Sequence, residues 1–450
     1  MPETTNKSDY DKMLNNQPQS KHQSPKKTMN RFGEWVKLIA ITGSAQVIVQ
    51  AISFLGGILV IRLLPTHEYA LYTIANTMLG TMMILADGGI AAGVMSQGGK
   101  VWQDRKKLGI VLVTGMQLRK KFAVFSLVVA IPALFYLLHK HNVSWLMASL
   151  IALSLIPAFF TSLSGILLQT APKLQQDIAP LQKIQILSNA GRLALLGLIL
   201  FIYPIAAVAI ACAGGSQIWS NWRLRKISNR YADSSQSADP KVRAEILSMV
   251  KRIMPGDIYY CISGQITIWL ISIFGSTEAV AQVGALGRLA MILNIVSVVL
   301  YTLIVPRFAR LPDNRNLLIK RFFQIEAALI LLSAGIMSIV WFFPIQTLWV
   351  LGGNYSNLTL EVILMAAGSC MTLLYGSVFS LCLQRGYVLH PKYTIGISLV
   401  SQILLLYIFG YSSVQNILAY SIGNSTIQFL MWTSYFLMVV FKKKSPCINI

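Results

Sequence analysis

Four of the ionisable side chains inside long apolar runs of this sequence are the first candidates for chemistry. They are Asp87, Arg192, Arg288 and Glu361. A charge at the centre of a lipid bilayer costs roughly 2.5 to 3.5 kcal/mol even on the most tolerant insertion scale. Each of these groups is therefore expected either to face a water-filled cavity or to pair with an opposite charge.

The two arginines could hold an anionic ligand inside such a cavity. A guanidinium group presents its donors in a planar fork that matches phosphate oxygens bidentately, so Arg192 and Arg288 would suit a diphosphate headgroup. Arg62 lies at the expected outer mouth and could equally anchor its helix end at the membrane interface. Asp87 and Glu361 could couple transport to a proton or sodium gradient, or could simply balance the arginines.

Neutral polar residues recur at helical spacing in both halves of the chain. Residues three, four and seven apart share one face of a helix, so these stripes are expected to line the same cavity. The candidates are Gln46 and Gln50 in the first apolar run, Asn76 on the face of Asp87, Tyr375 on the face of Glu361, and Asn424 with Gln428 near the C-terminus. Such groups also join packed helices by hydrogen bonds, and that alternative stays open for every stripe.

The composition excludes an ordinary soluble protein. Of the 450 residues 55% are hydrophobic and only 12% are charged, which indicates a polytopic membrane protein. The net charge of +22 would suggest a nucleic-acid partner in a soluble protein. Here the basic residues sort by loop, so no nucleic-acid partner is expected. The polar N-terminus lacks the apolar region of a cleaved signal peptide and is predicted to be a disordered tail.

A window of about 20 apolar residues predicts about twelve membrane-spanning helices. They cover residues 38–61, 69–95, 122–138, 143–166, 184–203, 204–222, 255–275, 281–305, 323–343, 359–383, 393–410 and 414–440. Residues 108–118 are predicted to form a separate interfacial segment, because Arg119, Lys120 and Lys121 interrupt the apolar run.

The expected fold is an all-α integral membrane protein with two six-helix bundles around a central cavity. Its predicted parts are a disordered cytoplasmic tail (1–34), an N-terminal bundle (35–222), a cytoplasmic linker (223–254), a C-terminal bundle (255–441) and a basic cytoplasmic tail (442–450). Two parallel six-helix repeats suit a transporter with its site between them. All of the 38 Lys and Arg residues except Arg62, Lys140, Arg192 and Arg288 fall on one side of this arrangement. Because cytoplasmic loops carry the basic excess, both termini are predicted to be cytoplasmic.

Enzyme and metal motifs are absent from the sequence. There is no phosphate-binding P-loop, no HExxH zinc motif and no Gly-rich strand-to-helix turn, so neither an enzyme nor a cofactor is expected. The histidines His67, His139 and His141 are predicted to be solvated loop residues. The five cysteines form no CxxC pair and are predicted to be small buried hydrophobic residues, apart from the one in the C-terminal tail. They are Cys212, Cys261, Cys370, Cys382 and Cys447.

Three motifs in order along the chain carry a family resemblance. The first apolar run ends in the pattern Arg62, Leu64, Pro65, Tyr69, Ala70 and Tyr72; the second motif is Val283–Leu311, which contains Pro306; the third is Leu348–Asn357. With these motifs, residues 33–441 resemble the bacterial polysaccharide exporters, the Wzx-like branch of a superfamily that also holds multidrug extruders and the lipid II flippase. Ala70 departs from that pattern, in which glycine is commoner after the tyrosine.

The resemblance implies a flippase in the bacterial inner membrane. Its substrate would be an undecaprenyl-diphosphate-linked oligosaccharide, moved to the outer leaflet by alternating access for exopolysaccharide, capsule or O-antigen synthesis. Membrane lipid, a polysaccharide polymerase and a chain-length regulator would be its partners. Two alternatives remain open at this point: a cation-coupled multidrug antiporter of the same superfamily, and a non-catalytic scaffold of a polymer-assembly complex.

Overall fold

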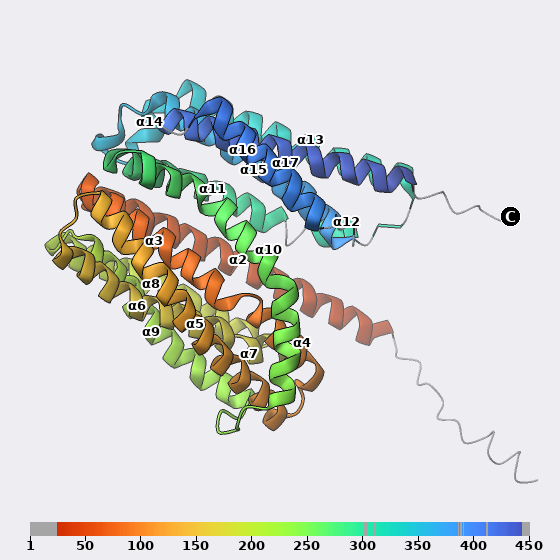
Figure 1. The fold of residues 1–450 in the computed structure, drawn as a ribbon. Coiled ribbons are helices and arrows are strands. Elements are labelled where there is room, and N and C mark those ends of the chain that lie inside the picture. Colours follow the sequence, from red (N-terminus) through yellow and green to blue (C-terminus); the bar gives the residue numbers. More distant parts are fainter. Residues whose placement is uncertain are drawn as a thin grey trace, which may run out of the picture.

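The structure, a computed structural model, describes residues 25–300, 304–309, 311–312, 314–385, 387, 389, 391–410 and 413–442. Within these ranges nearly every residue is helical and none is in a strand, which confirms the predicted all-α fold (Figure 1). The predicted tail before Pro25 and the tail after Lys442 lie outside the described residues.

The helices follow one another with short connections. In the first half they are α2 (Pro25–Leu63), α3 (Thr66–Asp87), α4 (Ile90–Val101), α5 (Arg105–Lys140), α6 (Trp145–Leu168), α7 (Thr170–Leu174), α8 (Ile178–Ile202) and α9 (Ala206–Tyr231). The second half holds α10 (Pro240–Phe274), α11 (Thr277–Val299), α12 (Val305–Ala309), α13 (Arg315–Phe342), α14 (Pro344–Trp349), the 3₁₀ turn η2 (Gly353–Tyr355), α15 (Thr359–Gln384), α16 (Pro391–Phe409) and α17 (Val414–Lys442).

Most of the predicted spans correspond to one long helix, or to part of one. By length and hydropathy, seven described helices qualify as membrane spans, or up to eight if the bent α10 counts as one. The long helices α9, α11, α16 and α17 do not qualify by these criteria. In α9 and α17 polar side chains alternate with apolar ones, and α16 is short. Large apolar side chains such as Leu153, Leu331 and Tyr407 are exposed, as a lipid-facing surface requires.

Two of the predicted boundaries are wrong, and local chemistry explains both. The span predicted for 69–95 breaks after Asp87, because Gly88 and Gly89 adopt the left-handed conformation that suits glycine. The predicted interfacial segment 108–118 instead continues into the next span as the single helix α5. Its Arg and Lys residues are good helix formers, so they do not interrupt it. At 1.5 Å per residue α5 is roughly 54 Å long and exceeds the bilayer core of about 30 Å.

The segment predicted as the linker 223–254 is mostly helical. The helix α9 continues to Tyr231, α10 begins at Pro240 after the N-cap Asp239, and only residues 232–239 lie between them. Similarly, α2 begins at Pro25, inside the predicted tail. Hydropathy marks only the apolar part of a helix, so polar turns that extend it beyond the membrane are not seen in the sequence.

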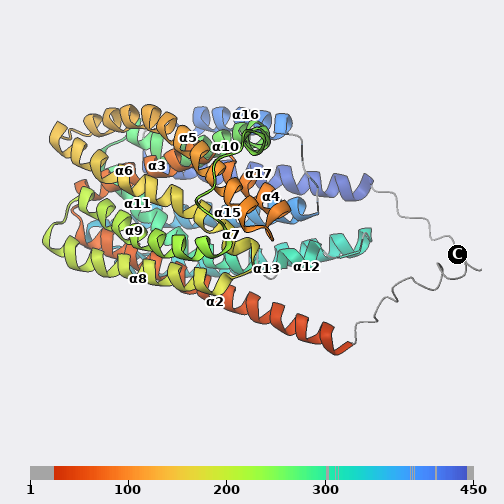
Figure 2. The same ribbon diagram turned by 90° about the horizontal axis from the view of Figure 1, so that it is seen from below.

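The helices form two groups, α2–α9 and α10–α17, and α10 and α11 of the second group pack against the first (Figures 1 and 2). In the first group α6 packs on α9, α2 on α8 and α3 on α5; in the second, α15 packs on α17 and α13. The first part of α10 lies against α3, α4 and α5, and α11 lies against α2 and α3 as well as α15. The four cysteines within the described helices are free and buried, as predicted; Cys447 lies outside the described residues.

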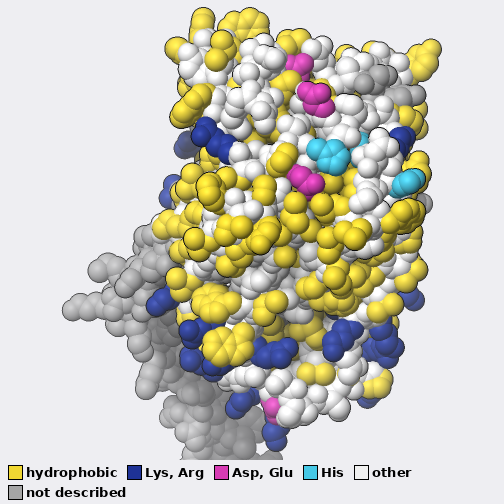
Figure 3. Space-filling view, turned by 90° about the vertical axis from the view of Figure 1, so that its left-hand side faces the viewer, with side chains coloured by type: hydrophobic (Ala, Val, Ile, Leu, Met, Phe, Trp, Pro, Cys, Tyr) yellow, Lys and Arg dark blue, Asp and Glu magenta, His cyan; other side chains and the backbone are white. Residues whose placement is uncertain are grey.

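Charge is unevenly distributed over the surface. In Figure 3 most of the Lys and Arg side chains gather toward the lower part of the molecule, hydrophobic side chains cover the middle, and most of the acidic side chains and the histidines lie above them. The arrangement of an apolar band beside a basic zone is typical of a protein that spans a bilayer.

The two groups of helices approach closely at Gly284 of α11. A Cβ atom placed there would lie 2.5 Å from Oγ1 and 2.8 Å from Cγ2 of Thr73 in α3, whereas a Cβ on Gly287 meets no described atom within 4 Å. We therefore expect Gly284→Val to destabilise the protein by about 1–3 kcal/mol through overpacking. The apparent melting temperature in detergent would test this. An equal loss for Gly287→Val, one turn further along, would show that the close approach is not the cause.

Candidate functional site

The two arginines chosen from the sequence converge on one tyrosine. Arg192 of α8 donates from Nη2 to the hydroxyl oxygen of Tyr72 in α3 at 3.3 Å, and the Arg288 guanidinium carbon of α11 lies 5.9 Å from the centre of the Tyr72 ring. Arg288 also passes so close to Gly57 of α2 that a Cβ there would lie 3.1 Å from its Cδ. Residues from both groups of helices thus meet at a single point.

Neither arginine at this point is neutralised by an acid. The ion pairs between described residues are Lys100–Glu245, Lys107–Asp104 and Arg119–Asp87, and none includes Arg192 or Arg288. Both side chains are half-buried, where charges are screened less than in water. Two adjacent guanidinium groups without a carboxylate can attract an anion and hydrogen-bond to its oxygens. We refer to Tyr72, Arg192 and Arg288 as the arginine cluster.

Asp87 pairs with an arginine that, from its place in a basic run, was predicted to lie in a loop. Its carboxylate forms an ion pair with Arg119 of α5, whose side chain is only 1% exposed, and Arg119 also donates from Nη1 to the Leu163 carbonyl at 2.5 Å. Asp87 Oδ1 accepts a further bond from the Ala91 amide at 3.2 Å. The pair balances charge inside the first group of helices, so among the alternatives left open for Asp87 the structure shows pairing, with Arg119 instead of Arg192 or Arg288.

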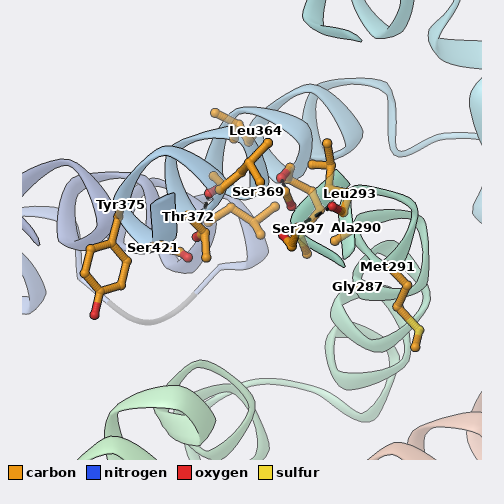
Figure 4. A pocket seen from close by; sticks show the side chains of 15 residues that line it. Gly287, Ala290, Met291, Leu293, Ser297, Leu364, Ser369, Thr372, Tyr375 and Ser421 are labelled. Atoms are coloured by element: carbon orange, nitrogen blue, oxygen red, sulfur yellow. Dashed lines mark hydrogen bonds between the residues drawn. The ribbon is translucent and has the colours of Figure 1, made fainter. Parts of the chain in front are cut away.

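A cavity of about 470 Å³ lies between α11, α15 and α17 (Figure 4). The side chains of Ser369, Thr372 and Tyr375 come from α15, and Ser421 of α17 lies beside them. Gly287, one residue before Arg288, belongs to the same lining. The cavity is therefore next to the arginine cluster along α11, and its polar lining consists of hydroxyl groups.

A second cavity of about 270 Å³ shares Tyr375 with the first. Its lining includes the predicted residues Asn424 and Gln428 of α17 together with Tyr259 of α10. Gln428 donates to Ser398 Oγ at 2.5 Å, which ties α17 to α16. The described lining contains no ionised side chain, so this region offers hydrogen bonds to hydroxyl and amide groups of a ligand without charge selection.

The remaining predicted residues are placed elsewhere. Arg62 donates to the backbone carbonyls of Trp349 at 2.7 Å and Val350 at 3.1 Å, so it anchors its helix end on the second group of helices. Glu361 accepts from Gln415 at 2.8 Å in the first turn of α15 and forms no ion pair with a described arginine. Asn76 is exposed, whereas Gln46 and Gln50 are half-buried on α2. None of these five residues lines the two cavities described above.

Three buried residues with an acidic, basic or imidazole side chain were not selected as site candidates from the sequence. Arg119 was assigned to a loop because it lies in a run of basic residues, and Glu326 lies near the start of the predicted span 323–343. His141 was predicted to be solvated but is only 4% exposed. For Glu326 the sequence did contain a signal, because an acid within an apolar run is costly and therefore marks a candidate functional residue. For Arg119 and His141 nothing in the local sequence indicates burial.

His141 connects the two groups of helices next to Lys140. Its Nδ1 lies 2.8 Å from Oγ1 of Thr277 and its Nε2 lies 3.0 Å from the Ser272 carbonyl oxygen. Burial lowers the pKa of His141, and the positive charges of His67 and Lys140 act in the same direction, whereas the bond to the Ser272 carbonyl opposes it. The folded protein therefore favours the neutral imidazole.

Acidification is expected to weaken this connection. Because the pKa of His141 is lower in the folded than in the unfolded protein, the unfolded state binds more protons, and stability falls as the pH drops through the ordinary histidine range near about 6.5. The apparent melting temperature of the wild type should therefore approach that of His141→Gln between about pH 7.5 and pH 5.5. A difference between the two proteins that stays constant with pH would contradict the prediction.

Comparison with known proteins shows a fold but no family. No protein-family profile matches the chain, and no curated protein matches it. An inward-facing multidrug resistance MATE family transporter of the MOP superfamily superposes with a TM-score of 0.70 at 14% identity, covering 88% of this chain and 96% of that chain. An outward-facing multidrug resistance MATE family transporter of the MOP superfamily gives a TM-score of 0.61 at 14% identity, covering 90% of this chain and 96% of that chain. A MATE transporter from Vibrio cholerae gives 0.60 at 11% identity, covering 91% and 97%. The chain therefore has a MATE-like fold with two helical bundles.

Proposed function

We propose that this chain is a membrane transporter that exports an amphiphilic solute by alternating access. The observation that carries the proposal is the arginine cluster, which joins side chains from both groups of helices next to a polar cavity. A site shared by two bundles is expected to change its exposure when the bundles move relative to each other. The likeness to MATE family transporters over most of the chain supports the same class of function.

The contacts between the bundles support an inward-facing state in this structure. Arg62, His141 and Tyr355 connect the bundles at the ends of helices that the basic residues place outside. The greater likeness to the inward-facing than to the outward-facing transporter agrees with this. In the proposed cycle these contacts break when the site opens to the outside. A proton or sodium gradient is the proposed energy source.

Two classes of substrate are consistent with the site. The first is a drug-like amphiphile: the structural neighbours are named multidrug transporters, and this substrate class has the broader support. The second is a lipid-linked oligosaccharide, which the unpaired arginines favour because a diphosphate needs cationic partners. The hydroxyl and amide groups around Tyr375 would then meet sugar hydroxyls. A bacterial inner-membrane location with both termini cytoplasmic is proposed for either class.

A deletion strain distinguishes these substrate classes. Loss of the chain is expected to lower tolerance to amphiphilic drugs if it is a multidrug exporter. It is expected to remove surface glycan, and to accumulate lipid-linked oligosaccharide on the inner leaflet, if it is a flippase; a polymerase and a chain-length regulator would then be its partners. Re-expression of the wild type should restore the missing trait. Unchanged drug tolerance together with unchanged surface glycan would contradict both assignments.

A further inference from the structure

Glu326 of α13 is a buried acid with no cationic partner among the described residues. Its side chain is 4% exposed, and it lies in the apolar core formed by α13, α15 and α17. Its Oε1 is 2.6 Å from Oγ of Ser377 in α15, whereas its Oε2 is buried and has no hydrogen-bond partner in the described structure. An ionised carboxylate in this position would keep a buried oxygen without any donor, which is costly.

The hydrogen bonds of Ser377 indicate which form of Glu326 fits. The Ser377 hydroxyl oxygen is also 2.8 Å from the Leu374 carbonyl oxygen, which can only accept. A serine has one proton to donate. If Ser377 donates to Leu374, the short contact to Glu326 is satisfied when a proton on Oε1 is donated to the serine oxygen. Oε2 is then a neutral carbonyl oxygen, for which a missing partner costs less than for a carboxylate.

Among the residues that the structure describes, none offers Glu326 a positive charge. Cys382 of α15 is the titratable group that interacts with it, and that thiol is itself buried. Arg385, at the C-terminal end of α15, donates to the backbone carbonyls of Phe308 and Leu311. Between Ser377 and the C-terminal part of α17 the packed side chains are apolar, including Phe436. Protonation is therefore the way in which this site can neutralise the acid.

The acid contacts the helix that carries the cavity lining. Tyr375 and Gly376 of α15 line the 470 Å³ cavity. The next residue of that helix, Ser377, is hydrogen-bonded to Glu326 of α13. A displacement of α15 that changes the cavity would also change the Ser377–Glu326 contact. Of the other acids within predicted spans, Asp87 pairs with Arg119, Glu361 accepts from Gln415, and Asp257 is half-buried instead of fully buried.

We propose that Glu326 is a proton-binding site that couples proton movement to the position of α15. In the packed arrangement seen here the carboxyl group is neutral and carries a proton taken from water. When α15 moves and water reaches the group, Oε1 releases that proton to water and becomes a carboxylate. The coupling role rests on the proposed transport function, whereas the proton site itself does not.

Infrared spectroscopy of the purified full-length protein tests the proton site without any substrate. A protonated carboxylic acid has a carbonyl stretch that a carboxylate lacks. We expect that band at neutral pH, its complete loss in Glu326→Gln, and its persistence in Glu245→Gln, which removes an exposed acid. Absence of the band from the wild type at every pH at which the protein stays folded would overturn the site. A band that persists in Glu326→Gln would assign it to another residue and would also overturn it.

Release of the proton is tested by reaction with dicyclohexylcarbodiimide, which modifies protonated buried carboxyl groups. Mass spectrometry should find the adduct on Glu326, and its yield should fall at least tenfold as the pH is raised from neutral to alkaline values. Removing Ser377 by Ser377→Ala should shift this fall to a different pH, while Ser369→Ala, a serine of the same helix that faces the cavity, should not. A yield independent of pH would show a permanently protonated structural acid and would refute coupling. These readouts do not use transport, so their failure is distinct from failure of the proposed function.

Discussion

Replacing Arg288 by alanine is expected to lower the apparent affinity for an exported anionic amphiphile by about 30- to 100-fold, and export should weaken accordingly. Loss of one partner of a desolvated charged hydrogen bond typically costs about 2–3 kcal/mol, and each 1.4 kcal/mol is a factor of ten. Arg288 is half-buried, forms no ion pair in the described structure, and shares Tyr72 with Arg192. Its removal leaves one guanidinium group to bind the anion. Because Arg288 forms no ion pair in the described structure, its removal breaks none that stabilises the fold.

The measurement is restoration of the missing trait in the deletion strain, with protein amount determined in the same membranes. Arg288→Lys keeps the charge but not the bidentate fork and should retain part of the activity. Arg252→Ala removes an exposed arginine from α10 and serves as the matched control. If Arg288→Ala and Arg192→Ala both export normally, the arginine cluster is not the site. Improved export in either variant would favour a cationic substrate.

Replacing Asp87 by asparagine is expected to destabilise the protein by about 3 kcal/mol. Breaking a buried ion pair by removing one partner leaves the other charge uncompensated, and this typically costs 3–5 kcal/mol. The lower end of that range applies because the Asp87 side chain is 26% exposed, whereas that of Arg119 is 1% exposed. The loss would appear as a lower apparent melting temperature in detergent and as less protein in the membrane.

A second substitution tests whether the uncompensated charge of Arg119 causes the loss of stability. Combining Asp87→Asn with Arg119→Gln removes both charges, so the double variant should recover much of the lost stability, and a double-mutant cycle gives the coupling free energy. The exposed pair Lys100–Glu245 is the matched control, because Glu245→Gln should cost less than about 1 kcal/mol. A double variant as unstable as Asp87→Asn alone would show that the pair is not what stabilises this region.

Much of the helical fold follows from local chemistry. Runs of about 20 apolar residues must become helices in a bilayer, because helices satisfy their own backbone hydrogen bonds. This reasoning locates α6 and α13 from composition alone, and it identifies Cys212 as a buried residue. It fails at helix ends, as at Tyr231 and Pro240, because a polar turn that continues a helix has no hydropathy signal.

The candidate site depends on how the helices are rotated and placed against one another. Charge alone selects Arg192 and Arg288 from the sequence, but their meeting at Tyr72 requires α3, α8 and α11 to come together. The sequence offers Asp87 several arginines, and the packing of α3 on α5 selects Arg119. Helical periodicity specifies which residues share a face of a helix, but it does not specify which other helix packs against that face. Partners such as these are chosen by contacts between distant segments, which only the tertiary structure contains.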